Sequence, residues 1–523
     1  MSEISTEIPP NVDATPPGAT HSPSVHRNFL VYICTQLLTW TVTFASISVI
    51  PRLLGESSSG KLVFAMTATM LPAGFLCLGI DQFLMKEIGR DADQSQRLAG
   101  GMIGLRLALI VPALLGSIIA GFVLHASRAD WTLIAILGPS GAACMFTLGF
   151  RAVFTGHERA RQVGASDLVA TSSSLIAIPF LRYGPVALAV ATTLTTMVNV
   201  AIQWRWLRKL TRMKPVFDLA LWRYLIRSGL PFCVNTYLLA AYGFVGVYIV
   251  RQNLGDAGLG VTGQVSKLFG TFMFIPVAMT SALLPSLARM ADRDMEAFNR
   301  TKLRVLSLLM VIGLPVVVLI LVLSPELCHL LYSKHQFVDM PLALQIIAFG
   351  VIPLYIVSSM YQFLVAQGRT AVWSGFLAST VVIYAVTANL SIPWCHAHLN
   401  NGPAGASIAT VVAEMSSAIA ALVLMKARVF DRDFINRLCR VALCAGAMGA
   451  VMVGSLRMIS AAVISESGVS IGLRLIVPGA AGLAVFACMA WSLRVMWPQD
   501  QEKLGELLTR GLARFRGSPR VPA

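Results

Sequence analysis

The stretch LGESSSG at residues 54–60 recurs as LGDAGLG at residues 254–260. Each copy lies in the loop between one long apolar run and the next. About six apolar runs of membrane-spanning length separate the two copies, so both halves would cross a membrane in the same orientation. Transporters built from such parallel repeats have two bundles related by an axis along the membrane normal. The sequence therefore predicts two similar bundles, each beginning near one copy of the motif.

The composition around this repeat is that of a membrane protein. Hydrophobic residues make up 56% of the chain and charged residues only 13%, and the mean hydropathy is +0.71, whereas soluble domains are ~25% charged. Because a spanning helix needs ~20 mostly apolar residues, we predict about fourteen transmembrane helices. The predicted fold is all-α and polytopic, with two pseudo-symmetric six-helix bundles and two additional C-terminal helices.

The apolar runs and the turns between them divide the chain into five parts. Residues 1–27 are rich in proline and lack the basic start of a cleavable signal, so we predict a disordered cytoplasmic tail. The N-terminal bundle is predicted over residues 28–215 and the C-terminal bundle over 216–428. Two additional spans follow in 429–497. Residues 498–523 are predicted to form a basic amphipathic tail that lies on lipid headgroups at the cytoplasmic face.

The distribution of basic residues along the chain predicts its orientation in the membrane. The formal net charge is +16, but no nucleic-acid-binding module accompanies it, so no nucleic-acid partner is expected. Most of the 41 Lys and Arg residues fall in alternate loops, and short cytoplasmic loops are enriched in these residues. We therefore predict a multi-pass protein of the plasma (inner) membrane with a cytoplasmic N-terminus.

The sequence contains no recognisable catalytic, nucleotide-binding or metal-binding motif. The nine cysteines are scattered and form no CxxC pair, and no Walker loop, HExxH or GxSxG occurs in a suitable setting. A membrane-embedded glycosyltransferase would need a catalytic carboxylate and a sizeable external loop, for which segment 325–340 leaves little room. The sequence predicts a protein that is not an enzyme and has no catalytic residue, cofactor or metal.

Cations within or at the ends of spans are the candidate substrate-binding residues, because a charge in the bilayer is costly. Arg106 and Lys267 lie inside predicted spans and could neutralise an anionic headgroup in a central cavity. For Arg106 the alternative is snorkelling toward the interface. Arg52 and Arg251 lie at corresponding outer ends of spans, where they either reach the cavity mouth or anchor the helix at the interface.

One carboxylate is the candidate for ion coupling. Glu414 lies at the centre of the predicted twelfth span, with apolar or small residues around it. There it could bind and release a proton during transport. The alternative is a structural pair or hydrogen bond with a neighbouring helix.

Several segments resemble one transporter family. Pro51 to Gly60, Leu78 to Ile88, and Trp222 to Phe232 are similar to the polysaccharide and O-antigen flippases of the multidrug/oligosaccharidyl-lipid/polysaccharide exporter superfamily. Lys267 matches a position that is often basic in that family, and the resemblance extends over about residues 28–430. It implies two bundles around a cavity that opens alternately to each side. The implied substrate is an undecaprenyl-diphosphate-linked oligosaccharide for O-antigen or exopolysaccharide assembly.

Two other transporter functions remain open. One is an ion-coupled multidrug or cation antiporter of the same superfamily, although the first predicted span contains no acidic residue. The other is a flippase for the peptidoglycan lipid precursor. For each we expect a monomer in the lipid bilayer. A glycan flippase would have the lipid-linked glycan as substrate and polysaccharide polymerase or assembly proteins as partners.

Overall fold

The computed structural model describes residues 23–211, 213–332, 336–367, 369–424, 432–462, 468–493 and 495. Within these ranges every regular element is a helix. The first helix begins at Pro23, inside the segment predicted as a disordered tail, and residues 1–22 lie outside the described part. The predicted C-terminal tail, 498–523, also lies outside it.

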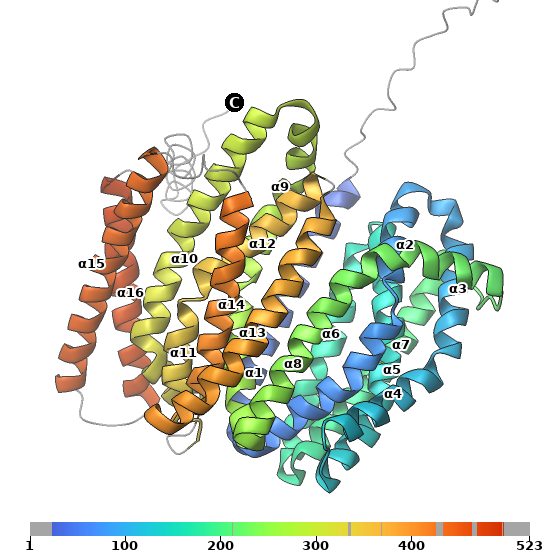
Figure 1. Cartoon of the computed structure of the whole chain (residues 1–523), viewed down its shortest axis with the longest axis horizontal. Coiled ribbons are helices and arrows are strands. Elements are labelled where there is room, and N and C mark those ends of the chain that lie inside the picture. The colour runs from blue at the N-terminus through green and yellow to red at the C-terminus, as the bar shows by residue number, and fades with distance from the viewer. Residues whose placement is uncertain are drawn as a thin grey trace, which may run out of the picture.

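The helices form two lobes and a flanking pair (Figure 1). The N-lobe comprises α1 (Pro23–Leu76), α2 (Ile80–Arg90), α3 (Ser95–Ala108), α4 (Ile110–Val123), α5 (Arg128–Gly156), α6 (Ala160–Ala177) and α7 (Pro185–Thr211). The C-lobe comprises α8 (Leu219–Phe272), α9 (Phe274–Arg293), α10 (Met295–Leu331), α11 (Met340–Ala348), α12 (Val351–Ala366), α13 (Thr370–Leu399) and α14 (Gly402–Leu424). The flanking pair is α15 (Arg432–Ala462) and α16 (Gly468–Ser492), which lies beside α10.

The two copies of the motif bend the first helix of each lobe. Gly55 in α1 has φ 78° and ψ 176°, and Gly255 in α8 has φ 66° and ψ −163°. A positive φ with extended ψ is a conformation that residues with a Cβ rarely adopt, so glycine permits each helix to turn back on itself. Both bends lie at the same end of the molecule, which we call the bend end (Figure 1).

The bends also pack against each other reciprocally. A Cβ built on Gly60 would lie 1.8 Å from the carbonyl oxygen of Asp256, and one on Gly260 would lie 2.0 Å from that of Glu56. The two helices therefore meet backbone to backbone. The glycine at the end of each motif copy contacts the acidic residue of the other copy. This is the arrangement that the predicted repeat requires, and it closes the two lobes against each other at the bend end.

Ten described helices are long and apolar enough to cross a membrane, or up to twelve if two bent pairs are each counted as one span. The bent pairs are α3 with α4 and α11 with α12. This count treats α1 and α8 as single helices although each is broken at its glycine. The polytopic all-α fold is confirmed, while the exact number of fourteen spans stays a prediction.

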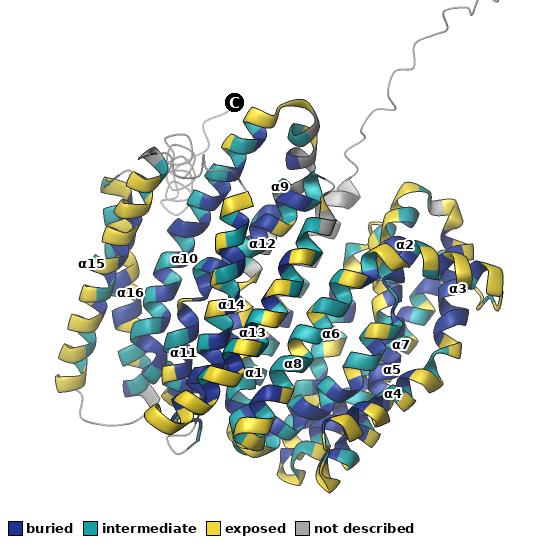
Figure 2. Cartoon of the chain, viewed as in Figure 1, coloured by how far each residue is buried: buried dark blue, intermediate teal, exposed yellow. Residues whose placement is uncertain are grey.

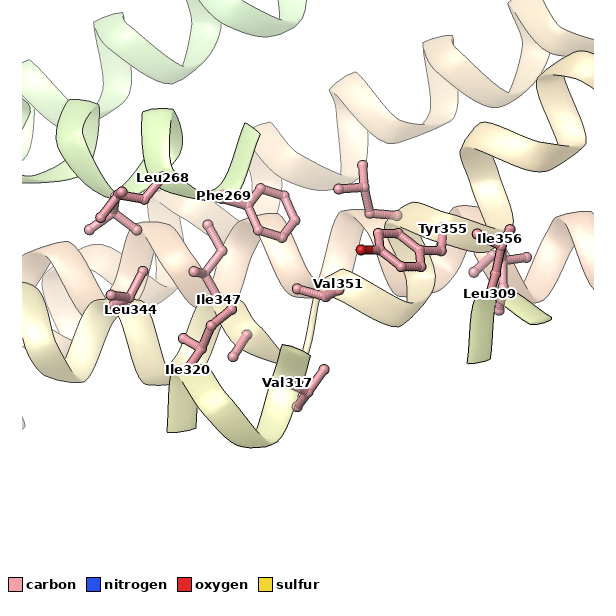
Figure 3. Close-up of a cluster of buried hydrophobic side chains, with 14 of the residues drawn as sticks. Leu268, Phe269, Leu309, Val317, Ile320, Leu344, Ile347, Val351, Tyr355 and Ile356 are labelled. Carbon is pink, nitrogen blue, oxygen red and sulfur yellow. The ribbon is translucent and has the colours of Figure 1, made fainter. Parts of the chain in front are cut away.

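Each lobe has its own apolar core. In the C-lobe, α8, α10, α11 and α12 pack around buried residues such as Leu309, Val351 and Tyr355 (Figure 3). In the N-lobe, α2, α3 and α5 enclose a second cluster that includes Leu84 and Phe150. A further cluster joins α15 and α16 to α10. A fourth cluster, which includes Ile50, Phe64 and Ile249, joins the two lobes along α1 and α8.

Many large apolar residues are exposed, and exposed residues, yellow in Figure 2, recur along the outer helices. On α4, Val111 is 62% exposed, Ile119 61% and Phe122 70%. Leu390 on α13 and Met458 on α15 are similarly exposed. Apolar surface of this extent would be unfavourable in water, whereas hydrocarbon is as apolar as the side chains themselves. These faces therefore fit contact with lipid.

Candidate functional site: an inter-lobe cavity

A cavity lies between the lobes in two adjoining compartments. The C-lobe compartment has a volume of about 670 Å³ and is lined by both arms of α8, the second arm of α1, and α11 to α14. The N-lobe compartment has about 780 Å³ and is lined by the first arm of α1, α6, α7 and the second arm of α8. Met66, Lys267 and Gly270 line both. The two compartments therefore meet at these residues.

Lys267 is the cationic side chain at this junction. It lies on the second arm of α8 and is exposed, and that exposed surface lines the cavity. The ion pairs found among the described residues do not include it. An ammonium group in a roomy cavity keeps water around it, which reduces the cost of its charge in the membrane. Lys267 can thus meet an anionic ligand from either compartment.

Glu414 lines the C-lobe compartment. It lies on α14 and is half-buried. Tyr242 and Tyr384, whose ring centroids are 5.0 Å apart in an edge-to-face arrangement, line the same compartment. The described part of the chain gives Glu414 no ion-pair partner. The carboxylate and the Lys267 ammonium therefore line the same cavity.

Eight hydroxyl residues line the N-lobe compartment, among apolar residues such as Phe44 and Ile47. Thr43 on α1 donates to the Thr39 carbonyl at 2.8 Å, and Ser46 donates to the Val42 carbonyl at 2.7 Å. Because each donates its proton to its own helix, its oxygen lone pairs remain free to accept a hydrogen bond from a ligand. The hydroxyl residues that line this compartment are Thr39, Thr43, Ser46, Thr171, Ser173, Ser174, Thr192 and Thr271.

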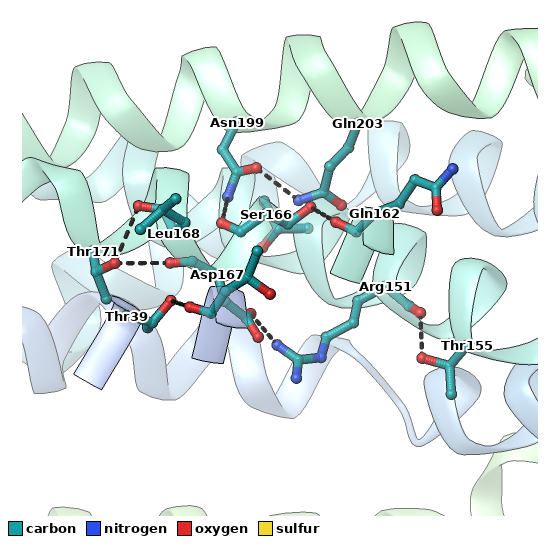
Figure 4. A network of polar contacts seen from close by, with 12 residues as sticks. Thr39, Arg151, Thr155, Gln162, Ser166, Asp167, Leu168, Thr171, Asn199 and Gln203 are labelled. Atoms are coloured by element: carbon teal, nitrogen blue, oxygen red, sulfur yellow. Dashed lines mark hydrogen bonds and ion pairs between the residues drawn. The ribbon is translucent and has the colours of Figure 1, made fainter. Parts of the chain in front are cut away.

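A polar network holds α5, α6 and α7 together behind this wall (Figure 4). Asn199 donates to the Ser166 carbonyl at 3.2 Å, and Gln203 donates to the Asn199 side chain at 3.0 Å. Arg151 pairs with Asp167, one turn before Thr171. These contacts join α5 to α6 and α6 to α7 behind the N-lobe wall.

Arg106 lies away from the cavity. Its side chain is only 1% exposed, and it donates to the Asp81 carboxylate and to the Met145 carbonyl within the N-lobe. Gly149 leaves room for it, because a Cβ there would lie 2.0 Å from a guanidinium nitrogen. Neither compartment is lined by Arg106. In this arrangement the Arg106 charge is neutralised by Asp81 in the lobe interior, away from both compartments, and a role of Arg106 in substrate binding stays a prediction.

The two arginines near the bends also lie outside both compartments. Arg52 is exposed at the bend end. Arg251 pairs with Asp130 and Asp256 at the same end. Among the four cations chosen from the sequence, the structure brings only Lys267 to the cavity wall. Arg251 instead joins the two lobes, which hydropathy alone could not reveal because its partner Asp130 is 121 residues away in sequence.

Sequence reasoning missed the hydroxyl wall and the role of Asp130. Isolated Ser and Thr residues are common in spans, so only their convergence in space marks a surface. For Asp130 a signal was present: Ser127 and Asp130 form a capping box at the start of α5. That spacing before an apolar run predicts a helix N-terminus and a fixed carboxylate.

Comparison with protein-family models gives two matches. Residues 25–291, just over half of the chain, match the model described as polysaccharide biosynthesis protein. Residues 270–478 match the model described as lipid II flippase MurJ. A search of curated protein sequences gives no match.

Comparison with solved structures identifies the same fold in several transporters. A lipid II flippase MurJ in an inward closed conformation has a TM-score of 0.71 at 12% identity, covering 89% of this chain and 98% of that one. An inward-facing multidrug resistance transporter of the MATE family has a TM-score of 0.62 at 17% identity, covering 76% and 98%. An outward-facing one scores 0.54 at 16% identity, covering 77% and 94%.

Proposed function

Because this chain belongs to the polysaccharide biosynthesis protein family, in the superfamily of multidrug, oligosaccharidyl-lipid and polysaccharide exporters, we propose that it is a flippase for a polyprenyl-linked glycan. The substrate is an undecaprenyl-diphosphate-linked oligosaccharide, a repeat unit of O-antigen or exopolysaccharide. It moves from the cytoplasmic to the outer leaflet of the plasma membrane by alternating access between the two lobes.

Lys267 is the observation that carries this proposal. It is exposed at the junction of the two compartments and has no ion-pair partner among the described residues. A diphosphate presents several anionic oxygens that accept charge-assisted hydrogen bonds from an ammonium group. The hydroxyl wall on one side of Lys267 offers oxygen lone pairs that accept hydrogen bonds from sugar hydroxyl groups. The cavity thus matches a ligand with an anionic centre and a polar, uncharged glycan.

The proposed orientation in the membrane rests on the charge distribution. Arg90, Arg97, Arg159, Arg208 and Arg223 are exposed at the end opposite the bends. Basic residues concentrate on the cytoplasmic side of membrane proteins. We therefore assign the bend end to the outer face and the N-terminus to the cytoplasm. With the bend end closed, the lobes are arranged to receive substrate from the cytoplasmic side.

The partner proteins are inferred from what must happen to the transported repeat unit. A flipped repeat unit must be joined to others in the outer leaflet, so a polysaccharide polymerase or assembly protein would take over the product. The cavity is bounded by the lobes of a single chain. We propose that the chain transports its substrate as a monomer.

Loss of the gene should remove one surface glycan. The change is a deletion in the native host, and the readouts are surface glycan by lectin or antibody binding and sensitivity to cationic drugs. We expect glycan display to disappear, drug sensitivity to stay unchanged, and a plasmid copy to restore the glycan. Unchanged glycan together with increased drug sensitivity would instead identify a multidrug antiporter.

A second candidate substrate is the peptidoglycan lipid precursor. The C-terminal match to the lipid II flippase model and the TM-score of 0.71 favour the peptidoglycan lipid precursor as the alternative cargo. That precursor also carries a diphosphate between lipid and sugar. The same deletion separates the two, because loss of peptidoglycan precursor export would cause lysis rather than loss of a surface glycan.

Glu414 is proposed to couple transport to a proton gradient, because it is the carboxylate that shares the cavity with Lys267. In proteoliposomes, an imposed proton gradient should accelerate glycan flipping by the native chain. We expect Glu414→Gln to flip at the same rate with and without the gradient, since the amide cannot exchange a proton. Glu414→Asp, which keeps a carboxyl group, should still respond. A normal response of Glu414→Gln to the gradient would rule out this role.

A further inference from the structure

Arg251 connects the two lobes at the bend end. It lies on the first arm of α8, one turn before Gly255. Its guanidinium approaches Asp130 Oδ2 of the N-lobe at 2.5 Å and Asp256 Oδ1 of its own lobe at 2.9 Å. The guanidinium carbon also lies 3.5 Å from the ring centroid of Phe64, again in the N-lobe. A single side chain thus makes two contacts across the lobe boundary and one within its own lobe.

Hydrogen bonds within the N-lobe hold the Asp130 carboxylate in the position where it contacts Arg251. Its side chain is fully buried, and the backbone N–H and hydroxyl of Ser127 each donate to its Oδ2 at 2.7 Å. These bonds belong to the capping box of α5, so they fix the carboxylate whether or not the lobes meet. A buried carboxylate needs a cationic partner or water. When the lobes are closed, Arg251 is that partner.

We propose that Arg251 is a lock that keeps the bend end closed by exchanging partners between lobes. In the closed arrangement it bridges Asp130 and Asp256. On opening, it separates from Asp130 and Phe64 and keeps Asp256, while water solvates Asp130. Neither charge is left buried without a partner in either arrangement, so the lock biases the equilibrium between two states instead of forbidding one.

Other contacts at the same end strengthen this assignment. The backbone N–H of Phe337 in the C-lobe donates to the side chain of Glu56 in the N-lobe. Ser48 donates to the carbonyl of Leu331 at 3.2 Å, also across the boundary. Both are hydrogen bonds that involve the backbone. Arg251 with Asp130 is the cross-lobe ion pair found among the described residues.

The position of Arg251 separates this role from substrate binding. It lines neither compartment of the cavity and is 15% exposed. It lines only a small pocket of about 160 Å³ at the bend end, together with Phe64, His125 and Tyr248. Arg251 therefore acts on the position of the lobes and not on the substrate. This proposal rests on the proposed alternating access and on the assignment of the bend end to the outer face.

The lock can be tested by labelling the cavity from outside. A chain with its nine cysteines replaced carries one new cysteine at Thr262, which lines the C-lobe compartment, and intact cells are treated with a membrane-impermeant maleimide. We expect Arg251→Gln and Asp130→Asn each to raise the labelling rate at least about tenfold, because each removes the charge pair that stabilises the closed state. Arg182→Ala, an exposed arginine that contacts only Tyr183 among the described residues, is the matched control and should leave the rate unchanged.

The double variant decides whether the two residues act through one contact. If they do, Asp130→Asn with Arg251→Gln labels no faster than either single variant. Unchanged labelling in the single variants, or effects that multiply in the double variant, would overturn the lock. The assay uses no substrate, so it can fail while glycan transport is demonstrated, and it can succeed even if the cargo is a different molecule.

Discussion

Replacing Lys267 with Ala is expected to lower the rate of glycan flipping at least about tenfold and to remove the glycan from the cell surface. A hydrogen bond to a charged group contributes about 1.5–3 kcal/mol, and this side chain is the cation at the junction of the two compartments. The measurement is surface glycan in a deletion strain that carries the variant, with the amount of protein in the membrane determined in parallel.

Two variants make this result specific. Lys267→Arg keeps the positive charge and should retain much of the glycan, although the planar guanidinium will not reproduce the native geometry. Arg182→Ala removes a positive charge outside both compartments and should leave the glycan unchanged. Normal glycan display by Lys267→Ala at normal membrane levels would exclude Lys267 from the substrate site.

Replacing Gly60 or Gly260 with Ala is expected to prevent closure of the bend end. The new Cβ would lie 1.8 Å or 2.0 Å from a carbonyl oxygen of the opposite lobe, and the backbone cannot yield as a side chain could. Within a helix, Gly→Ala is otherwise favourable by about 0.5–1 kcal/mol. Any loss of function must therefore come from the lobe contact. We expect both variants to lose transport and to label from outside at least about tenfold faster.

The repeat supplies a strong internal comparison for this experiment. Gly60 and Gly260 occupy equivalent positions, so their alanine variants should have similar effects. A Cβ added to Gly74 in α1 or to Gly243 in α8 would meet no atom within 4 Å. The alanine variants of these two glycines should retain transport and a low labelling rate. An active Gly60→Ala variant with a closed bend end would contradict the reciprocal contact.

The features readable from the sequence are those encoded locally. Apolar runs of membrane length predicted an all-helical membrane protein. The two LG(E/D)xxxG copies predicted a repeat, because a glycine that adopts positive φ leaves a signature in its own neighbourhood. Lys267 could be selected because an ionisable residue within a span is rare. Each of these inferences needs only a short window of residues.

The features that the sequence did not reveal depend on contacts between distant helices. Arg106 pairs with Asp81 on another helix, and only the folded N-lobe shows that this pair neutralises the charge away from the cavity. Arg251 resembles an interface anchor in sequence, yet its partner Asp130 belongs to the other lobe. Helical periodicity tells which residues share a face, but not which helix that face meets.

Purified protein in liposomes tests the central claim most directly. Vesicles are prepared with an undecaprenyl-diphosphate-linked oligosaccharide whose glycan is detected by a lectin added outside, and with the native chain or Lys267→Ala. The native chain is expected to bring glycan from the inner leaflet into reach of the lectin, and Lys267→Ala to do so at least about tenfold more slowly. Equal lectin binding in vesicles with the native chain and in protein-free vesicles would contradict a flippase for this substrate.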